Sequence, residues 1–207
     1  MQRIAIFASG AGSNAEKIIE YFANLTPSLT PLERGVKIPF IEVAMIVCNK
    51  PGAGVLNIAE RYNIPTLLID KEKFFRGNAY VEELKEQKIG FIVLAGFLWK
   101  LPDALIKAYP NRIINIHPAL LPKYGGKNMY GEKVHQAVID NHEKESGITI
   151  HYVDEHYDNG DIIFQVTCPV LPDDTSFSLS HRVQLLEHTH YPRIIEKLVT
   201  GKEVGNK

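Results

Sequence analysis

The stretch Ile113-Ile-Asn-Ile-His-Pro-Ala-Leu-Leu-Pro122 decides how the rest of the chain is interpreted. Its isoleucines predict a short buried strand. Asn115 and His117 lie two residues apart as that strand ends, so both side chains point the same way. Pro118 favours an extended His117. The stretch predicts an amide and an imidazole at the carboxyl end of a strand, where ligands bind in open α/β sheets. A surface histidine beside a strand-end asparagine stays open as the alternative.

Apolar runs and segments of helical periodicity alternate before this stretch and change character after it. Strands are predicted near residues 3–9, 41–47, 65–69 and 89–95, and helices near 15–22, 54–62, 79–86 and 103–108. A helix near 132–139 is followed by two alternating runs, 147–153 and 161–166, and the turn Asp158-Asn-Gly160 between them predicts an antiparallel hairpin. A helix over 176–199 closes the chain, with Pro192 as a kink or a break. This order predicts a single-domain α/β fold: a mainly parallel Rossmann-like sheet with an antiparallel C-terminal hairpin edge and helices on both faces.

The composition narrows the class of protein. The 207 residues suffice for one domain with a full core, and the formal net charge of −1 argues against a general grip on nucleic acid or anionic membrane. Cys48 and Cys168 belong to no CxxC pair, which indicates free thiols in a reducing compartment. No run is long enough for a membrane span, and no signal peptide is evident. We therefore expect a cytoplasmic protein, with an exposed excursion over the proline-rich residues 25–39.

Gly10-Ala-Gly-Ser-Asn14 lies between the first predicted strand and the first helix. Glycines allow close approach of the backbone, Ser13 offers a hydroxyl, and a helix N-terminus favours an anion. Gly10-x-Gly12-x-x-Ala15 also fits the loose dinucleotide fingerprint, but Val47-Cys-Asn-Lys50 offers no carboxylate for a ribose, and the loop lacks the Lys-Ser/Thr pair of a P-loop. A phosphate monoester of a small molecule therefore fits better than NAD or ATP. A glycine turn that only joins strand to helix is the alternative.

Two further groups bear on the chemistry. Asp is a common turn residue, so Asp158 gains a role only if its turn folds over His117. In that case the carboxylate would hold the imidazole, raise its pKa and make it a better proton donor near neutrality. The eight histidines show no HExxH or comparable spacing, and we expect no metal. Glu187 is interpreted as a solvated charge unless its helix face turns to the cleft.

Six segments in a fixed order resemble the phosphoribosylglycinamide formyltransferase family over nearly the whole chain. They are Ala8-Ser-Gly-Ala-Gly-Ser-Asn14, Val93-Leu-Ala-Gly-Phe97, Asn115-Ile-His-Pro-Ala-Leu-Leu-Pro-Lys-Tyr124, Gly147-Ile-Thr-Ile-His151, Asp158-Asn-Gly160 and Gln184-Leu-Leu-Glu-His-Thr-His-Tyr-Pro192. The Asn-x-His-Pro segment marks the wider superfamily that uses formyltetrahydrofolate, and the glycine loop with the Glu187 segment narrows it to this member.

The resemblance implies transfer of a formyl group from 10-formyltetrahydrofolate, as co-substrate, to the amine of glycinamide ribonucleotide in de novo purine (IMP) biosynthesis. It implies neither a metal nor a covalent enzyme intermediate. It also implies an N-terminal phosphate-binding half over about residues 1–100 and a C-terminal catalytic and folate-binding half over about 101–207. We expect a monomer or weak homodimer, with no nucleic acid or membrane partner. The implied residues are Asn115, His117 and Asp158 for catalysis, Gly12, Ser13 and Asn14 for the phosphate, and Glu187 for the ribose.

For the folate, Leu98, Trp99, Lys100 and Leu101 match the backbone segment that lines the family's pterin pocket, together with Asn115. Arg76 corresponds to a folate-contacting arginine of the family, with the local spacing shifted by about one residue. The sequence departs from the family in three places: the excursion over 25–39 is longer, Trp99-Lys100 replaces an Arg-containing pair, and the loop Gly125–Gly131 is longer. None of these departures removes a catalytic residue.

Other functions remain to be separated from this one. A 10-formyltetrahydrofolate hydrolase or another formyltransferase of the superfamily, such as one acting on methionyl-tRNA, would use the same donor. Such hydrolases usually carry a regulatory domain, and the tRNA enzyme a basic C-terminal domain. A non-catalytic nucleotide-binding module of Rossmann type is the alternative from a different class. It would have no use for Asn115, His117 and Asp158 together.

Overall fold

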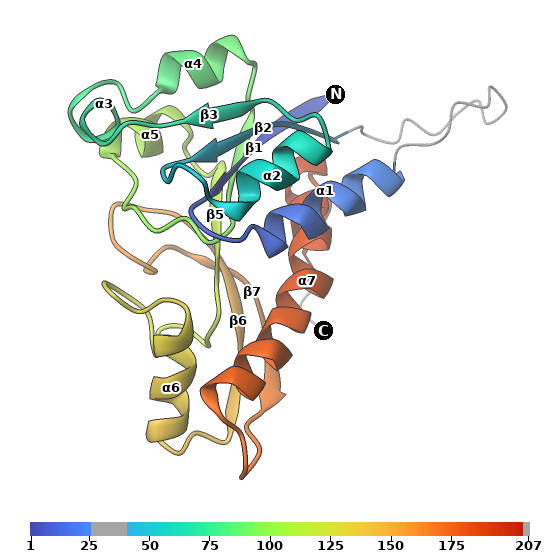
Figure 1. The fold of residues 1–207 in the computed structure, drawn as a ribbon, viewed down its shortest axis with the longest axis vertical. Helices are drawn as coiled ribbons and strands as arrows, with labels where there is room; N and C mark the ends of the chain where they lie inside the picture. The colour runs from blue at the N-terminus through green and yellow to red at the C-terminus, as the bar shows by residue number, and fades with distance from the viewer. Residues whose placement is uncertain (26–40, 205–207) are drawn as a thin grey trace, which may run out of the picture.

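The computed structural model describes residues 1–25 and 41–204. One seven-stranded sheet runs through it in the order β3-β2-β1-β4-β5-β6-β7 (Figure 1). The first five strands of this order are parallel, and β6 and β7 are antiparallel to their neighbours. The predicted fold class is therefore confirmed, including the antiparallel C-terminal edge. The strands are β1 (Gln2–Ala8), β2 (Ile41–Cys48), β3 (Thr66–Leu68), β4 (Phe91–Leu94), β5 (Ile113–His117), β6 (Glu145–Tyr152) and β7 (Ile162–Pro169).

The helices in the described part of the chain follow the predicted order with one addition. They are α1 (Ser13–Leu25), α2 (Gly54–Arg61), α3 (Lys71–Arg76), α4 (Val81–Glu86), α5 (Asp103–Ala108), α6 (Glu132–Asp140) and α7 (Ser176–Thr200). Sequence reasoning missed α3, a six-residue helix whose N-cap Asp70 accepts hydrogen bonds from the next backbone N–H groups. Pro192 lies inside α7 without breaking it (Figure 1). The break that the proline allowed for does not occur.

The core forms two layers, one on each face of the sheet. On β1, Ile4 and Ile6 pack in the cluster that contains α1, α2 and α7. Ala5 and Phe7 pack in the cluster that contains α3, α4 and α5. A strand buried on both faces has an almost continuous apolar sequence, as β1 has. β1 is therefore an interior strand of the sheet, with helices on both faces as predicted.

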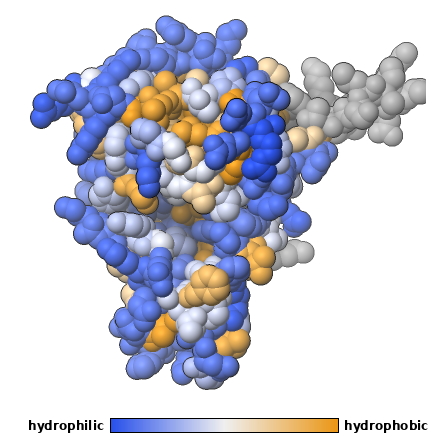
Figure 2. Space-filling view, viewed as in Figure 1, coloured by the Kyte–Doolittle hydropathy of each residue, from blue (hydrophilic) through white to orange (hydrophobic). Residues whose placement is uncertain are grey.

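Figure 2 shows a largely hydrophilic face, with apolar residues gathered in its upper half. Within residues 1–25 and 41–204, no helix has the length and apolar character needed to cross a bilayer. The predicted excursion over residues 25–39 lies outside the described residues, apart from Leu25 at the end of α1.

Strand order places the functional loops side by side. From β1 the chain builds outward through β2 and β3, and then returns to build β4 and β5 on the other side of β1. The crevice beyond the carboxyl ends of β1 and β4 is the usual ligand site of such sheets. The loop Gly10–Asn14 follows β1, and His117 ends β5. The two segments that sequence reasoning singled out therefore meet at one edge of the sheet.

Candidate active site

A cavity of about 780 Å³ opens at this edge. The carboxyl ends of β1, β4 and β5 form its floor, and residues 126–132, the Asp158 turn and α7 form its walls. Its volume is in the range of cavities that hold small organic ligands. Of the residues predicted for the site, it is lined by Asn14, Leu98, Asn115, His117, Asp158 and Glu187.

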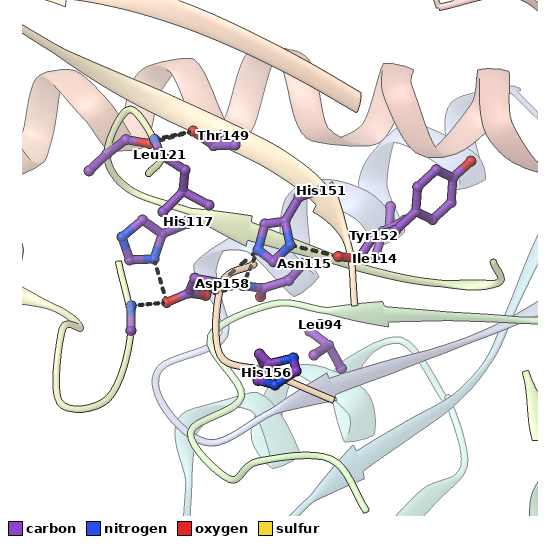
Figure 3. Close-up of polar contacts among 12 residues, drawn as sticks. Leu94, Ile114, Asn115, His117, Leu121, Thr149, His151, Tyr152, His156 and Asp158 are labelled. Carbon is purple, nitrogen blue, oxygen red and sulfur yellow. Dashed lines mark hydrogen bonds and ion pairs between the residues drawn. The ribbon is translucent and has the colours of Figure 1, made fainter. Parts of the chain in front are cut away.

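The three predicted catalytic side chains converge in this cavity (Figure 3). Asn115 and His117 lie on the same face of β5, as their spacing predicts. Asp158 Oδ2 lies 3.6 Å from His117 Nδ1. Asn115 Nδ2 donates a hydrogen bond of 3.4 Å to Asp158 Oδ1. An amide, an imidazole and a carboxylate therefore meet, although Asp158 lies more than forty residues from His117 in the chain.

The turn that carries Asp158 is held over the sheet by a hydrogen bond from the Gly126 backbone and by the close packing of Gly160 on β6. Asp158 has a positive φ of 51°. Gly126 N donates to Asp158 Oδ2 at 2.8 Å. Gly160 is required at its position, because a Cβ there would lie 2.0 Å from the Tyr152 carbonyl oxygen. The turn after β6 therefore folds over His117, which is the condition on which the functional role of Asp158 depended.

His151 is a member of this cluster to which sequence reasoning gave no role. It faces Asn115 across the β5–β6 pair. Its Nδ1 lies 2.8 Å from the Tyr152 carbonyl oxygen, which places a proton on Nδ1. Its Nε2 lies 3.2 Å from Asn115 Nδ2 and 3.6 Å from Asp158 Oδ1. The alternation of β6 was the signal, since His151 is an inward position of that strand.

The electrostatics of His117 differ from the expectation. Burial lowers its pKa, and the charge of Asp158 and the hydrogen bond to the Tyr124 carbonyl only partly offset that effect. The charge of Asp158 raises the His117 pKa, as expected. The prediction of a net rise is wrong, because the effect of burial is larger. His117 Nε2 donates to Tyr124 O at 2.7 Å, while Nδ1 faces the carboxylate, so each ring nitrogen faces an acceptor.

The pKa of Asp158 itself is lowered. Burial raises it, but the hydrogen bond to His151, the charge of His117 and the Gly126 N–H outweigh that effect. Asp158 is therefore an ionised carboxylate at neutral pH, even though its side chain is largely buried. It can stabilise a proton on His117 whenever one arrives.

The three residues predicted to bind the phosphate have different roles in the structure. Gly12 has φ +86°, and a Cβ there would lie 2.8 Å from Val55 Cβ, so this glycine allows α1 to pack on α2. Ser13 begins α1, and its hydroxyl accepts from Gln184 Nε2 at 3.1 Å. Asn14 lines the cavity. The loop therefore presents a helix N-terminus and neutral hydrogen-bonding groups, tied to α7.

Glu187 lies on the face of α7 that turns to the cavity. Its Oε2 accepts a hydrogen bond of 2.9 Å from Asn14 Nδ2. Burial raises the pKa of Glu187 to about 7, and the Asn14 contact opposes that rise. The interpretation of Glu187 as a solvated charge is therefore wrong, and the carboxyl group joins α7 to the glycine loop.

The residues predicted for folate are distributed over two environments. Leu98 lines the cavity and is half exposed. Trp99 packs against Phe74 and Phe75, with ring centroids 5.6 and 5.5 Å apart, and Leu101 is buried in the core. Lys100 and Arg76 are exposed, and neither lines the cavity. Arg76 forms an ion pair with Glu72. The structure therefore brings only Leu98 of this segment to the cavity.

Two further side chains line the cavity without having been assigned a function. His135 on α6 is 5% exposed, and burial, reinforced by the charge of His117, lowers its pKa to about 4. Gln184 on α7 holds the Ser13 hydroxyl. Sequence reasoning had the motif around Gln184 but no signal for His135. Among the described residues, no group of three or more His, Cys, Asp or Glu side chains is arranged to hold a metal ion.

An open α/β sheet that brings a carboxylate, an amide and an imidazole together beside a glycine loop at a helix N-terminus is typical of group-transfer enzymes. Comparison with known proteins identifies the family and the chemical group that it transfers. Residues 2–195 match the family described as formyl transferase. The chain therefore belongs to the formyl transferase family.

Individual relatives agree with this assignment. The chloroplastic phosphoribosylglycinamide formyltransferase of Vigna unguiculata is 39% identical over 210 residues, covering all of this chain and 64% of the plant protein. The phosphoribosylglycinamide formyltransferase of Bacillus subtilis is 34% identical over 211 residues, with complete coverage of both chains. The crystal structure of the Bacillus halodurans enzyme of that name has a TM-score of 0.82 at 37% identity, covering 96% of each chain.

Proposed function

We propose that this protein transfers the formyl group of 10-formyltetrahydrofolate to the primary amine of glycinamide ribonucleotide, in purine (IMP) biosynthesis. The observation that carries the proposal is the convergence of Asn115, His117 and Asp158 in one cavity with the Gly10–Asn14 loop. Membership of the formyl transferase family and the names of the full-length relatives support it.

The chemistry follows from what each side chain can donate. The amine attacks the formyl carbon, and negative charge grows on the formyl oxygen. Asn115 offers an amide N–H to that oxygen. His117 offers its Nε2–H, which the Tyr124 carbonyl accepts in the free protein. Donors already in place where charge develops stabilise the transition state without reorganisation.

Protons must move as the carbon–nitrogen bonds exchange. The attacking amine loses a proton when its bond to the formyl carbon forms, and the folate nitrogen gains one when its bond to that carbon breaks. Asp158 is ionised and faces His117 Nδ1, so it holds the imidazole as a cation while the proton is in transit. A water molecule in the cavity completes the transfer. Two substrates in one cavity make the reaction effectively intramolecular.

The remaining site assignments belong to the same proposal. The phosphate binds the loop of Gly12, Ser13 and Asn14, and Glu187 contacts the ribose. The position of Glu187 beside Asn14 supports this pair of assignments. The pterin binds along Leu98, Trp99, Lys100 and Leu101 beside Asn115, and Arg76 contacts the donor from outside the cavity lining. The half-exposed Leu98 at the cavity edge supports the pterin assignment.

We also propose the setting in which the enzyme works. It is a cytoplasmic monomer or weak homodimer that takes small-molecule substrates and neither nucleic acid nor membrane. A nearly balanced formal charge supports the absence of a nucleic-acid partner. Size-exclusion chromatography over a range of protein concentrations measures the oligomeric state directly.

The experiment that tests the proposal follows folate absorbance with and without glycinamide ribonucleotide. Donor consumption should depend on the acceptor. Consumption of the donor without the acceptor would instead identify a 10-formyltetrahydrofolate hydrolase. If the donor is not consumed in either case, the protein is a non-catalytic nucleotide-binding module.

His117→Ala should lower turnover at least ~10²-fold, because general acid work by a positioned imidazole contributes about that much. Circular dichroism of the variant should match the parent, which separates loss of chemistry from loss of fold. Turnover near that of the parent would remove His117 from the mechanism.

A further inference from the structure

The charges that face the cavity are unbalanced in a way the proposed catalytic residues do not explain. Its lining carries three carboxyl groups, those of Glu132, Asp158 and Glu187, and burial raises the pKa of Glu187 to about 7, so that group is only partly ionised at neutral pH. Within the described residues, Lys127 is the only Lys or Arg in that lining. Three histidines also line the cavity. Burial lowers the pKa of His117 and His135, and the ring of His181 packs against Phe177. The cavity therefore holds one permanent positive charge.

A positive charge in the cavity favours an anionic substrate. The phosphate monoester of the acceptor carries close to two negative charges at neutral pH. The loop Gly10–Asn14 offers it neutral donors only, namely backbone N–H groups, a hydroxyl and an amide. Bringing the phosphate beside carboxylates without a cation would be opposed by like-charge repulsion. A cation elsewhere in the cavity lining would offset that repulsion and add to the neutral donors of the loop.

The backbone of Lys127 is fixed in a defined turn. Met129 N donates to Gly126 O at 3.1 Å, which makes Lys127 and Asn128 the central residues of a four-residue turn. Asn128 has φ +71°, the left-handed conformation that the third position of a type II turn requires and that asparagine tolerates. Gly126 N in turn donates to Asp158 Oδ2 at 2.8 Å. The turn that presents Lys127 to the cavity is therefore anchored to the carboxylate beside His117.

We propose that the Lys127 ammonium, which lines the same cavity as the glycine loop, binds the phosphate of the acceptor and supplies a positive charge that the loop lacks. This inference rests on the proposed function. It assigns a role to the longer loop Gly125–Gly131, in which this sequence departs from the family it resembles. Lys127 is a substrate-binding residue in this proposal, with no part in proton transfer.

The test pairs a protein change with a substrate change. Lys127→Ala and Lys127→Gln should raise the KM for glycinamide ribonucleotide about tenfold, the usual effect of losing a hydrogen bond to a charged group. Lys127→Arg should restore most of the affinity. With dephosphorylated acceptor, glycinamide riboside, the parent and Lys127→Ala should have the same KM, since the group that Lys127 binds is gone. Lys107→Ala, the same charge change on α5 outside the cavity, is the matched control and should leave both KM values unchanged.

A readout without turnover completes the design. The Ki of ribose 5-phosphate as a competitive inhibitor should rise with Lys127→Ala by the same factor as the KM. An equal penalty for phosphorylated and dephosphorylated acceptor would overturn the proposal. The proposal would also be overturned if the rise in KM caused by Lys127→Ala disappeared with a folate donor that lacks its glutamate. That result would show that Lys127 binds the carboxylates of the donor. Absence of formyl transfer by the parent protein would instead reject the proposed function, so the two failures are distinguishable.

Discussion

At the scale of single residues, Asp158 connects the parts of the site. It contacts His117, Asn115 and His151, and it accepts from the Gly126 backbone. A buried carboxylate is stable as an anion only when such partners surround it. The lowered pKa of Asp158 is the result, so its carboxyl group is ionised at neutral pH.

The pKa of Glu187 is shifted in the opposite direction to that of Asp158, because burial raises it. Its titration should therefore change the free energy of unfolding with pH. Its pKa is raised from 4.5 to about 7 in the folded protein, so the neutral form is favoured by folding. The corresponding stabilisation is complete below pH 4.5 and is lost as pH rises through about 7. Over that interval the free energy of unfolding of the parent should fall by up to about 3 kcal/mol relative to Glu187→Gln, which cannot ionise.

Urea denaturation of both ligand-free proteins at pH 5, 6, 7 and 8 measures this difference. The curves should converge or cross as the parent ionises. Parallel pH profiles for the parent and Glu187→Gln would show that Glu187 titrates normally in the folded state.

At the scale of elements, the segment after β5 is held by one buried hydroxyl. Thr149 Oγ1 donates to Ala119 O at 2.7 Å and accepts from Leu121 N at 3.0 Å. Gln165 Nε2 from β7 donates to the same hydroxyl oxygen and to Leu121 O. Since Thr149 pairs with His117 in the β5–β6 register, this network fixes the chain just beyond the imidazole of His117.

Thr149→Val should therefore weaken both the fold and catalysis. The substitution keeps the shape of the side chain but leaves a buried N–H and a buried carbonyl unpaired, which should cost about 1–3 kcal/mol of unfolding free energy. Turnover should fall, since the loop that carries the Tyr124 carbonyl is released. Thr149→Ser keeps the hydroxyl and should retain most of both properties. Equal stability of the valine and serine variants, by urea denaturation, would contradict the role given to the hydroxyl.

At the scale of the whole molecule, α7 ties the two predicted halves together. Its Tyr191 hydroxyl donates to Leu94 O at 2.8 Å and lies 3.4 Å from Ile114 O. Glu196 accepts from Tyr21 on α1 at 2.7 Å, and Ser176 donates to Glu132 on α6 at 2.9 Å. Figure 1 shows α7 running along α1 and down beside β6. A helix shared in this way makes the halves interdependent.

We therefore predict that residues 1–207 unfold as one domain in a single cooperative transition. Trp99, the only tryptophan of the sequence, reports on the N-terminal half by fluorescence, while far-ultraviolet circular dichroism reports on all helices. The two denaturation curves should coincide, as two-state unfolding requires. Separate midpoints would show that the halves are independent domains.

Local patterns were sufficient for most of the fold. Period-two and helical patterns identified the strands and the longer helices, because burial on a sheet face or helix stripe imposes those periods wherever an element is long enough. The six-residue α3 was missed because it spans less than two turns, too short for a period to show. Its cap, Asp70, was the remaining signal.

The sequence by itself determined the sheet, the glycine loop, and the presentation of Asn115 and His117 on one face, because each of these follows from neighbours in the chain. Only the tertiary structure decided that His151 joins Asn115, that Glu187 turns to Asn14, and that burial lowers the pKa of His117. These facts depend on how much water remains around a group and on which distant segment packs against it. Neither quantity is a property of a residue and its neighbours in the chain, and both are fixed only when the sheet and α7 close around the cavity.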